Sequence, residues 1–141
     1  MPVAARRSSA SASQAVIVEI LDLSDTWDSI DQIELMLKRL KTLRLYRPNL
    51  LYRGIDGRRV ANVRKFGTDQ NQDIVFCSKE QDMLDPCADP AGNAFQFATE
   101  WPTPAIIVYN PDLLVQRDEY AYAFAPGVKP LPAVLAVFVL D

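Results

Sequence analysis

The sequence predicts an α+β fold, and three observations support that prediction. One amphipathic helix near the amino terminus precedes short apolar strands that lie mostly in the second half of the chain. That order differs from the regular alternation of strand and helix that builds a parallel sheet. The length of 141 residues suits one compact domain, and 49% hydrophobic with 23% charged residues suffices for a real core.

The first fourteen residues, MPVAARRSSASASQ, are small and polar, with two arginines and no acid. They lack the apolar region of a secretory signal, so we expect a disordered tail over residues 1–14 and a single domain over residues 15–141. No apolar run reaches the length of a transmembrane helix. The sequence therefore predicts a soluble, cytoplasmic protein.

A strand and a long helix are expected at the start of the domain. Residues 15–23 (AVIVEILDL) are β-branched and apolar, which predicts a buried strand. Ser24 or Asp25 is then expected to cap a helix over residues 25–44. Apolar side chains recur along it at spacings of three and four, at Trp27, Ile30, Ile33, Met36, Leu37, Leu40 and Leu43.

Proline and glycine divide the middle of the chain. Residues 47–49 (Arg-Pro-Asn) are expected to end the helix. A short strand at 50–52 is expected next, followed by a turn over 54–57. Residues 58–66 predict a short helix, which Gly67 ends in a left-handed cap.

Four further strands are expected at residues 74–77, 105–109, 120–124 and 133–140. Residues 79–90 contain two prolines and three aspartates and predict an irregular loop with room for one helical turn, whereas residues 93–100 (NAFQFATE) predict a short helix. The last strand is expected to leave an open edge at which a partner strand can pair.

Composition excludes several kinds of chemistry. The chain has no histidine, which excludes Ser-His-Asp and Cys-His catalytic sets and His-ligated zinc. Cys77 and Cys87 cannot complete a zinc site and are expected to be reduced thiols, with a disulfide between them as the alternative. The net charge of −3 disfavours a general nucleic-acid-binding surface. Neither a glycine-rich phosphate loop nor a calcium loop occurs, so no metal is expected.

Three polar residues stand next to predicted strands. Arg53 suits a planar or anionic ligand such as a phosphate, and Gly54 after it would allow close backbone access. Ser78 ends a strand at a place where its hydroxyl can orient a ligand. Glu119 begins a strand, and Asp118 would raise its pKa if both were buried together. The alternative for each is an ordinary solvated polar group at a strand end.

A set of short motifs resembles the ADP-ribosyltransferase-like fold in order and spacing. The resemblance is closest to its arginine-serine-glutamate branch, to which cholera toxin belongs, and it covers residues 50–141. It implies a split β-sheet core, here preceded by the long helix. The motifs are YRG at 52–54, FG at 66–67, IVFCS at 74–78, NAFQFA followed by PAIIVY, and DEYAYAF followed by PLPAVLAVFVLD.

The resemblance implies an NAD-dependent ADP-ribosyltransferase or an NAD glycohydrolase, of the small toxin or effector kind. It assigns NAD binding to Arg53, Gly54 and Ser78, and it makes Glu119 the catalytic carboxylate that stabilises the cationic ribose as nicotinamide leaves. NAD is then a substrate, and the acceptor macromolecule is unknown. Arginine-modifying members carry Glu or Gln where this chain has Arg117, so modification of protein arginine is not implied.

Two alternatives stay open at this point. A catalytically inactive member of the same fold would be a protein-interaction domain that docks a partner through the helix at 25–44 or through the last strand. A transferase acting on a nucleic-acid phosphate is the other alternative, and the net negative charge counts against it.

Overall fold

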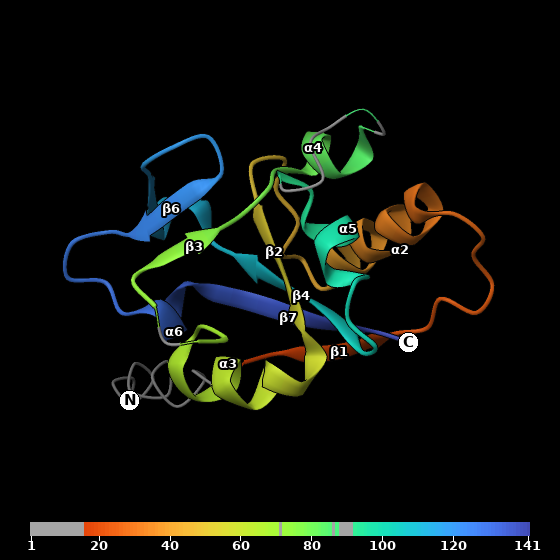
Figure 1. Cartoon of the computed structure of the whole chain (residues 1–141), viewed down its shortest axis with the longest axis horizontal. Coiled ribbons are helices and arrows are strands. Elements are labelled where there is room, and N and C mark those ends of the chain that lie inside the picture. The colour runs from red at the N-terminus through yellow and green to blue at the C-terminus, as the bar shows by residue number, and fades with distance from the viewer. Residues whose placement is uncertain (1–15, 71, 86, 88–91) are drawn as a thin grey trace, which may run out of the picture.

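The computed structural model describes residues 16–70, 72–85, 87 and 92–141, so the tail predicted at 1–14 lies outside the described residues. Two sheets form the centre of this part of the chain (Figure 1). The larger sheet has the strand order β1 (Val18–Leu21), β7 (Val134–Leu140), β4 (Pro104–Tyr109) and β2 (Leu51–Asp56). The smaller sheet has the order β3 (Ile74–Phe76), β6 (Ala121–Phe124) and β5 (Leu114–Gln116). The α+β class is therefore confirmed.

The described helices are α2 (Ser29–Thr42), α3 (Val60–Phe66), α4 (Glu80–Leu84), α5 (Ala94–Ala98) and α6 (Pro130–Ala133), with 3-10 turns η1 (Gly57–Arg59) and η3 (Pro111–Leu113). α2 lies within the range predicted at 25–44 but is shorter at both ends. Its cap is Asp28, whose carboxylate accepts a hydrogen bond from the Asp31 N–H, and not Ser24 or Asp25. Trp27 precedes the helix and is 96% exposed, so its assignment to the apolar stripe is wrong. No described helix is long and apolar enough to cross a membrane.

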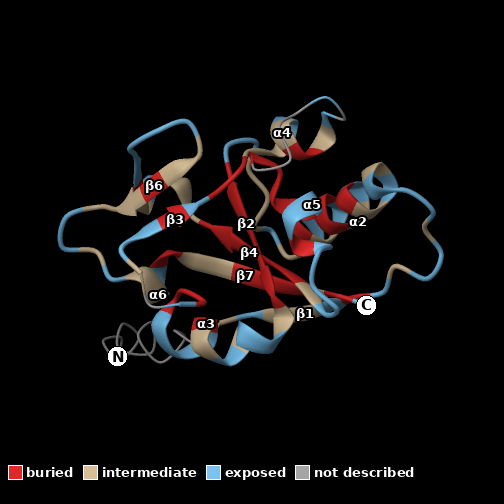
Figure 2. Ribbon diagram, in the orientation of Figure 1, coloured by how far each residue is buried: buried red, intermediate tan, exposed pale blue. Residues whose placement is uncertain are grey.

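The larger sheet separates two hydrophobic cores, because successive side chains of a strand point to opposite faces. On one face, Tyr52 and Phe138 pack with the buried side of α2 and with α5. On the other face, Leu51 and Ile107 pack with the smaller sheet, α3 and α6. Figure 2 shows this buried centre in red along β2, most of β4 and the middle of β7, whose first part is tan.

β7 is not the open edge that the sequence predicts. It pairs in parallel with β1 on one side and antiparallel with β4 on the other. Its sequence, VLAVFVL, is apolar throughout, as expected for a strand covered on both faces. β1 lies at one edge instead, where Ile20 is 72% exposed, so the expectation of a buried first strand is also wrong.

β2 continues through Gly54 to Asp56, although the sequence predicts a turn over 54–57. A Cβ atom at Gly54 would overlap the carbonyl oxygen of Ala94 and lie 2.9 Å from the amide nitrogen of Ala98. Glycine at this position therefore lets α5 pack directly against the strand. Gly67 does end α3 in the left-handed conformation, with φ of 87°, as predicted.

Candidate functional site

A cleft of about 680 Å³ lies between β2, β3 and α5. Its volume falls within the range of small-molecule and cofactor sites. Arg53 and Gly54 of β2 line it, together with Ser78, which follows β3. The structure thus brings these three predicted site residues together.

The two sheets meet at one backbone contact beside this cleft. Tyr52 and Ser78 exchange two hydrogen bonds, with Tyr52 N donating to Ser78 O at 2.9 Å and Ser78 N donating to Tyr52 O at 2.8 Å. The bridge links β2, which belongs to the larger sheet, to the residue that follows β3, which belongs to the smaller sheet. Arg53 follows Tyr52 on β2, and its side chain reaches the Phe76 carbonyl of β3.

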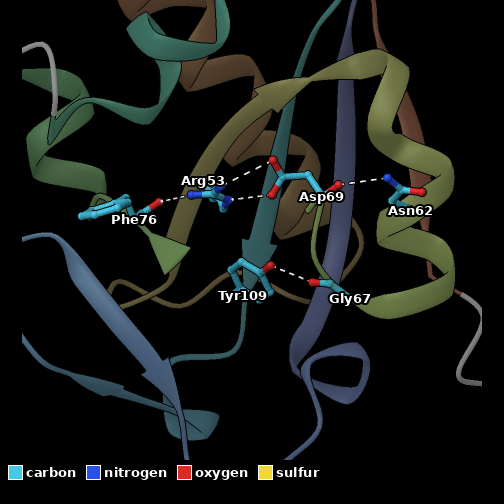
Figure 3. A network of polar contacts seen from close by, with 6 residues as sticks. All are labelled: Arg53, Asn62, Gly67, Asp69, Phe76 and Tyr109. Carbon is cyan, nitrogen blue, oxygen red and sulfur yellow. Dashed lines mark hydrogen bonds and ion pairs between the residues drawn. The ribbon is translucent and has the colours of Figure 1, made fainter. Parts of the chain in front are cut away.

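Arg53 is held by an acidic partner that the sequence did not single out. Its Nε donates to Asp69 Oδ1 at 3.0 Å and its Nη2 donates to Asp69 Oδ2 at 3.4 Å, while Nη1 donates to the Phe76 carbonyl at 3.3 Å (Figure 3). Both charged side chains are at least nine-tenths buried. A guanidinium has five N–H groups, so two remain for a ligand after these three bonds. Because Asp69 neutralises the charge of Arg53, Arg53 contributes hydrogen-bond donors to the cleft and little net positive charge.

The segment that carries Asp69 is itself fixed at both ends. Asn62 of α3 donates to the Asp69 carbonyl at 3.0 Å, and the Tyr109 hydroxyl of β4 donates to the Gly67 carbonyl at 2.7 Å (Figure 3). The left-handed Gly67 turns the chain from α3 toward β2. No motif indicated this role for Asp69, because its partner lies 16 residues away on another element.

Ser78 is buried and has a structural contact. Its Oγ accepts a hydrogen bond at 2.7 Å from the backbone N–H of Ala94, the first residue of α5. That N–H has no partner within the helix, so Ser78 satisfies it from another element. The bond uses the oxygen and leaves the hydroxyl hydrogen for a ligand.

Cys77 also lines the cleft but is not a reactive thiol. Burial raises its pKa to about 12, against a smaller lowering effect of the Arg53 charge. The thiolate is the nucleophilic form of cysteine, so this side chain is inert at neutral pH. Cys77 and Cys87 are both free, and the disulfide alternative is not formed.

Glu119 lies in the hairpin turn between β5 and β6 and is not among the residues that line the cleft. Its side chain is exposed, as is that of Asp118, so the shared burial considered for this pair is not present. Its N–H donates to Asp118 Oδ1 at 2.8 Å. The next residue, Tyr120, accepts a hydrogen bond at 2.8 Å from the N–H of Cys77 in the cleft wall. Glu119 therefore precedes, in the chain, a residue that is hydrogen-bonded to the wall of the cleft.

A different carboxylate, Glu100, lines the cleft just beyond the end of α5. Two aromatic rings, Phe76 at 62% exposure and Phe97 at 40%, line it as well. Glu100 was not predicted as a site residue, because it ends a short helix in a stretch without a catalytic motif. The cleft thus offers hydrogen-bond donors, one unburied carboxylate and aromatic surface.

Within the described residues, no group of three or more Cys, Asp or Glu side chains is placed to hold a metal ion. The candidate chemistry is therefore that of hydrogen-bond donors, carboxylates and aromatic rings. No protein-family model, curated protein or solved structure matches this chain.

Proposed function

We propose that this protein is an NAD-dependent ADP-ribosyltransferase or NAD glycohydrolase, and that its two sheets are the split core of an ADP-ribosyltransferase-like fold. The observation that carries the proposal is that Arg53 of β2 and Ser78, which follows β3 of the other sheet, line one cleft of about 680 Å³. A volume of this order accommodates a large part of a dinucleotide.

The reaction breaks the bond between the ribose C1′ and the pyridine nitrogen of NAD. The bonding electron pair leaves with nicotinamide, which becomes neutral, and C1′ becomes cationic. A nucleophile on an acceptor, or water, then bonds to C1′ and loses its proton to solvent. A carboxylate fixed near C1′ stabilises the developing charge, and the reaction needs no histidine.

Arg53 and Ser78 are proposed to bind NAD through their remaining N–H and O–H donors. Since Asp69 already neutralises Arg53, these donors suit ribose hydroxyls as well as phosphate oxygens. Gly54 carries no side chain on the strand that lines the cleft, and Phe97 offers a surface on which the pyridine ring can stack.

Glu119 is the proposed catalytic carboxylate, and Glu100 is the alternative that the lining of the cleft adds. The test is incubation with NAD labelled in its ADP-ribose part, followed by measurement of released nicotinamide. Labelled macromolecule indicates a transferase, as a small toxin or effector would be, and free ADP-ribose indicates a glycohydrolase. Unchanged nicotinamide release in Glu119→Ala would exclude the role proposed for Glu119.

A second candidate is a catalytically inactive interaction domain, and the pairing of Arg53 with Asp69 favours it. The sequence predicts that a partner docks on α2 or on β7. Neither is open to a partner through its apolar side or its strand edge, because the apolar side of α2 faces the core and β7 is paired on both sides. Absence of both nicotinamide release and a thermal shift at millimolar NAD would support this candidate over the enzyme.

A further inference from the structure

β1 is an edge strand, and within the described residues no strand pairs with its outer side. The Ile17 carbonyl accepts a hydrogen bond from β7 at 2.8 Å, and the Leu21 carbonyl accepts one at 3.0 Å from the residue that follows β7. Alternate residues of a strand direct their backbone N–H and C=O groups to the same side. Val18 and Ile20 therefore direct theirs away from β7, where a further strand can bind them.

The side chains of β1 do little to block such pairing. Ile20 is 72% exposed and lies on the same face as Val18, which packs against the core. Glu19 is the one charged residue of the strand, and Arg39 of α2 binds it on the opposite face. Edge strands that avoid association usually carry lysine, proline or a bulge, and β1 (VEIL) has none of these.

A second cavity, of about 330 Å³, lies beside this edge between β1 and α2. Leu21 and Leu35 give it apolar surface, and Lys38 and Arg39 line it as well. Arg39 is paired with Glu19, whereas Lys38 is exposed and has no ion pair within the part of the chain that the structure describes. A strand that presents an acidic residue between apolar ones toward α2 therefore complements this surface.

β1 and the residue before it carry that pattern, because Ile17, Glu19 and Leu21 lie at every second position on the face toward α2. We propose that two copies of this chain associate by antiparallel pairing of β1 about a two-fold axis at Ile20. Such an interface is self-complementary, and it joins two four-stranded sheets into one. None of the residues that line the cleft belongs to β1, so the association does not depend on the proposed enzymatic activity.

Charge and burial select this register among the antiparallel pairings of the free edge. An axis at Glu19 would place two carboxylates opposite each other, which is unfavourable. An axis at Val18 would place Glu19 opposite a residue outside the cavity lining. An axis at Ile20 packs the two exposed isoleucines against each other and places Glu19 opposite Leu21 of the second copy, beside the cavity that Lys38 lines.

Sedimentation equilibrium of the full chain tests the association. The wild type is expected to be mainly dimeric at about 0.1 mM. Ile20→Lys places a charge at the axis and should raise the Kd of the dimer at least about tenfold, without loss of folding because Ile20 is largely exposed. Ile74→Lys, at another exposed isoleucine on β3, is the matched control and should keep the wild-type Kd. A monomeric wild type, or an equal Kd in the wild type and Ile20→Lys, overturns the proposal.

The charge contact has its own pair of variants. Lys38→Glu should raise the Kd of the dimer at least about threefold, because it sets two carboxylates against each other in both halves of the interface. Lys41→Glu makes the same change in net charge on the same helix, outside the cavity lining, and should have a smaller effect. Equal effects of the two variants would contradict the contact between Glu19 and Lys38.

Disulfide cross-linking tests the position of the axis. In a Cys87→Ser background the remaining native thiol, Cys77, is buried. Ile20→Cys in that background should give a covalent dimer under mild oxidation, because the Cα atoms of an antiparallel hydrogen-bonded pair lie about 5.5 Å apart. Trp27→Cys, at a position that is 96% exposed, is the control and should give little covalent dimer. Equal yields from the two variants would overturn the pairing about Ile20.

Discussion

Arg53 and Asp69 form a buried ion pair in which two N–H groups of the guanidinium bond to the two carboxylate oxygens, at 3.0 and 3.4 Å. The pair joins β2 to the segment between α3 and β3. It fixes the orientation of the guanidinium of Arg53, which lines the cleft. The positioning of Arg53 therefore depends on Asp69.

Asp69→Asn should destabilise the protein by about 3–5 kcal/mol, because it leaves the Arg53 charge buried without its counterion. Urea denaturation measures the loss in the free energy of unfolding. Asp112→Asn is the matched control, since its pair with Arg47 is largely exposed and should contribute at most about 1 kcal/mol. Equal losses in the two variants would contradict a special role for Asp69.

Ser78→Ala should cost about 1–3 kcal/mol, because the buried N–H of Ala94 then lacks its acceptor. The control is Thr99→Ala, which removes an exposed hydroxyl that bonds the Gln96 carbonyl on the same short helix. If the proposed function holds, Ser78→Ala also weakens NAD binding at temperatures where the variant stays folded. A stability loss no larger than that of Thr99→Ala would argue against the cap.

The two candidate carboxylates can be separated directly. Glu119→Gln and Glu100→Gln each remove one negative charge from an exposed side chain, so neither should change stability by more than about 0.5 kcal/mol. The variant that lacks the catalytic carboxylate should lose about 100-fold or more in kcat for nicotinamide release. Loss confined to Glu100→Gln would transfer the catalytic role to Glu100.

Stability should fall steeply at alkaline pH. In the unfolded chain the Cys77 thiol ionises near its ordinary pKa of 9.0, whereas burial raises the pKa to about 12 in the folded protein. Between these values the unfolded state loses the proton and the folded state keeps it, so the free energy of unfolding decreases as pH rises. The expected slope for this group is about 1.4 kcal/mol per pH unit.

Burial also raises the pKa of Tyr52 and of Tyr109, so these two side chains add to the decrease in the free energy of unfolding at alkaline pH. Cys77→Ala should make the decline between pH 9 and 12 shallower without abolishing it. Urea denaturation at a series of pH values measures both slopes, and identical slopes in wild type and variant would contradict the buried-thiol contribution.

Much of the fold could be predicted because its signals are local. The apolar runs of β4 and β7 and the left-handed cap at Gly67 are set by residues close together in the chain. The interior place of β7 was missed because strand order depends on pairing between distant segments. Gly54 was assigned to a turn because a glycine required by α5 is indistinguishable, in sequence, from a turn glycine.

The site divides in the same way. Arg53 and Ser78 could be singled out as polar residues beside apolar strands, and both line the cleft. Asp69 and Glu100 could not, because their significance comes from a buried partner and a place in the cleft wall. Each of these properties arises only when distant segments are packed together.

The central claim is that NAD binds in the cleft beside Arg53 and Ser78, and calorimetric titration with NAD tests it most directly. Gln70 is an exposed residue of the lining, so Gln70→Trp should fill part of the cleft without disturbing the core. The wild type should bind NAD at one site, and Gln70→Trp should weaken that binding by at least about tenfold. No binding at millimolar NAD, or equal affinity in the two proteins, would contradict the claim.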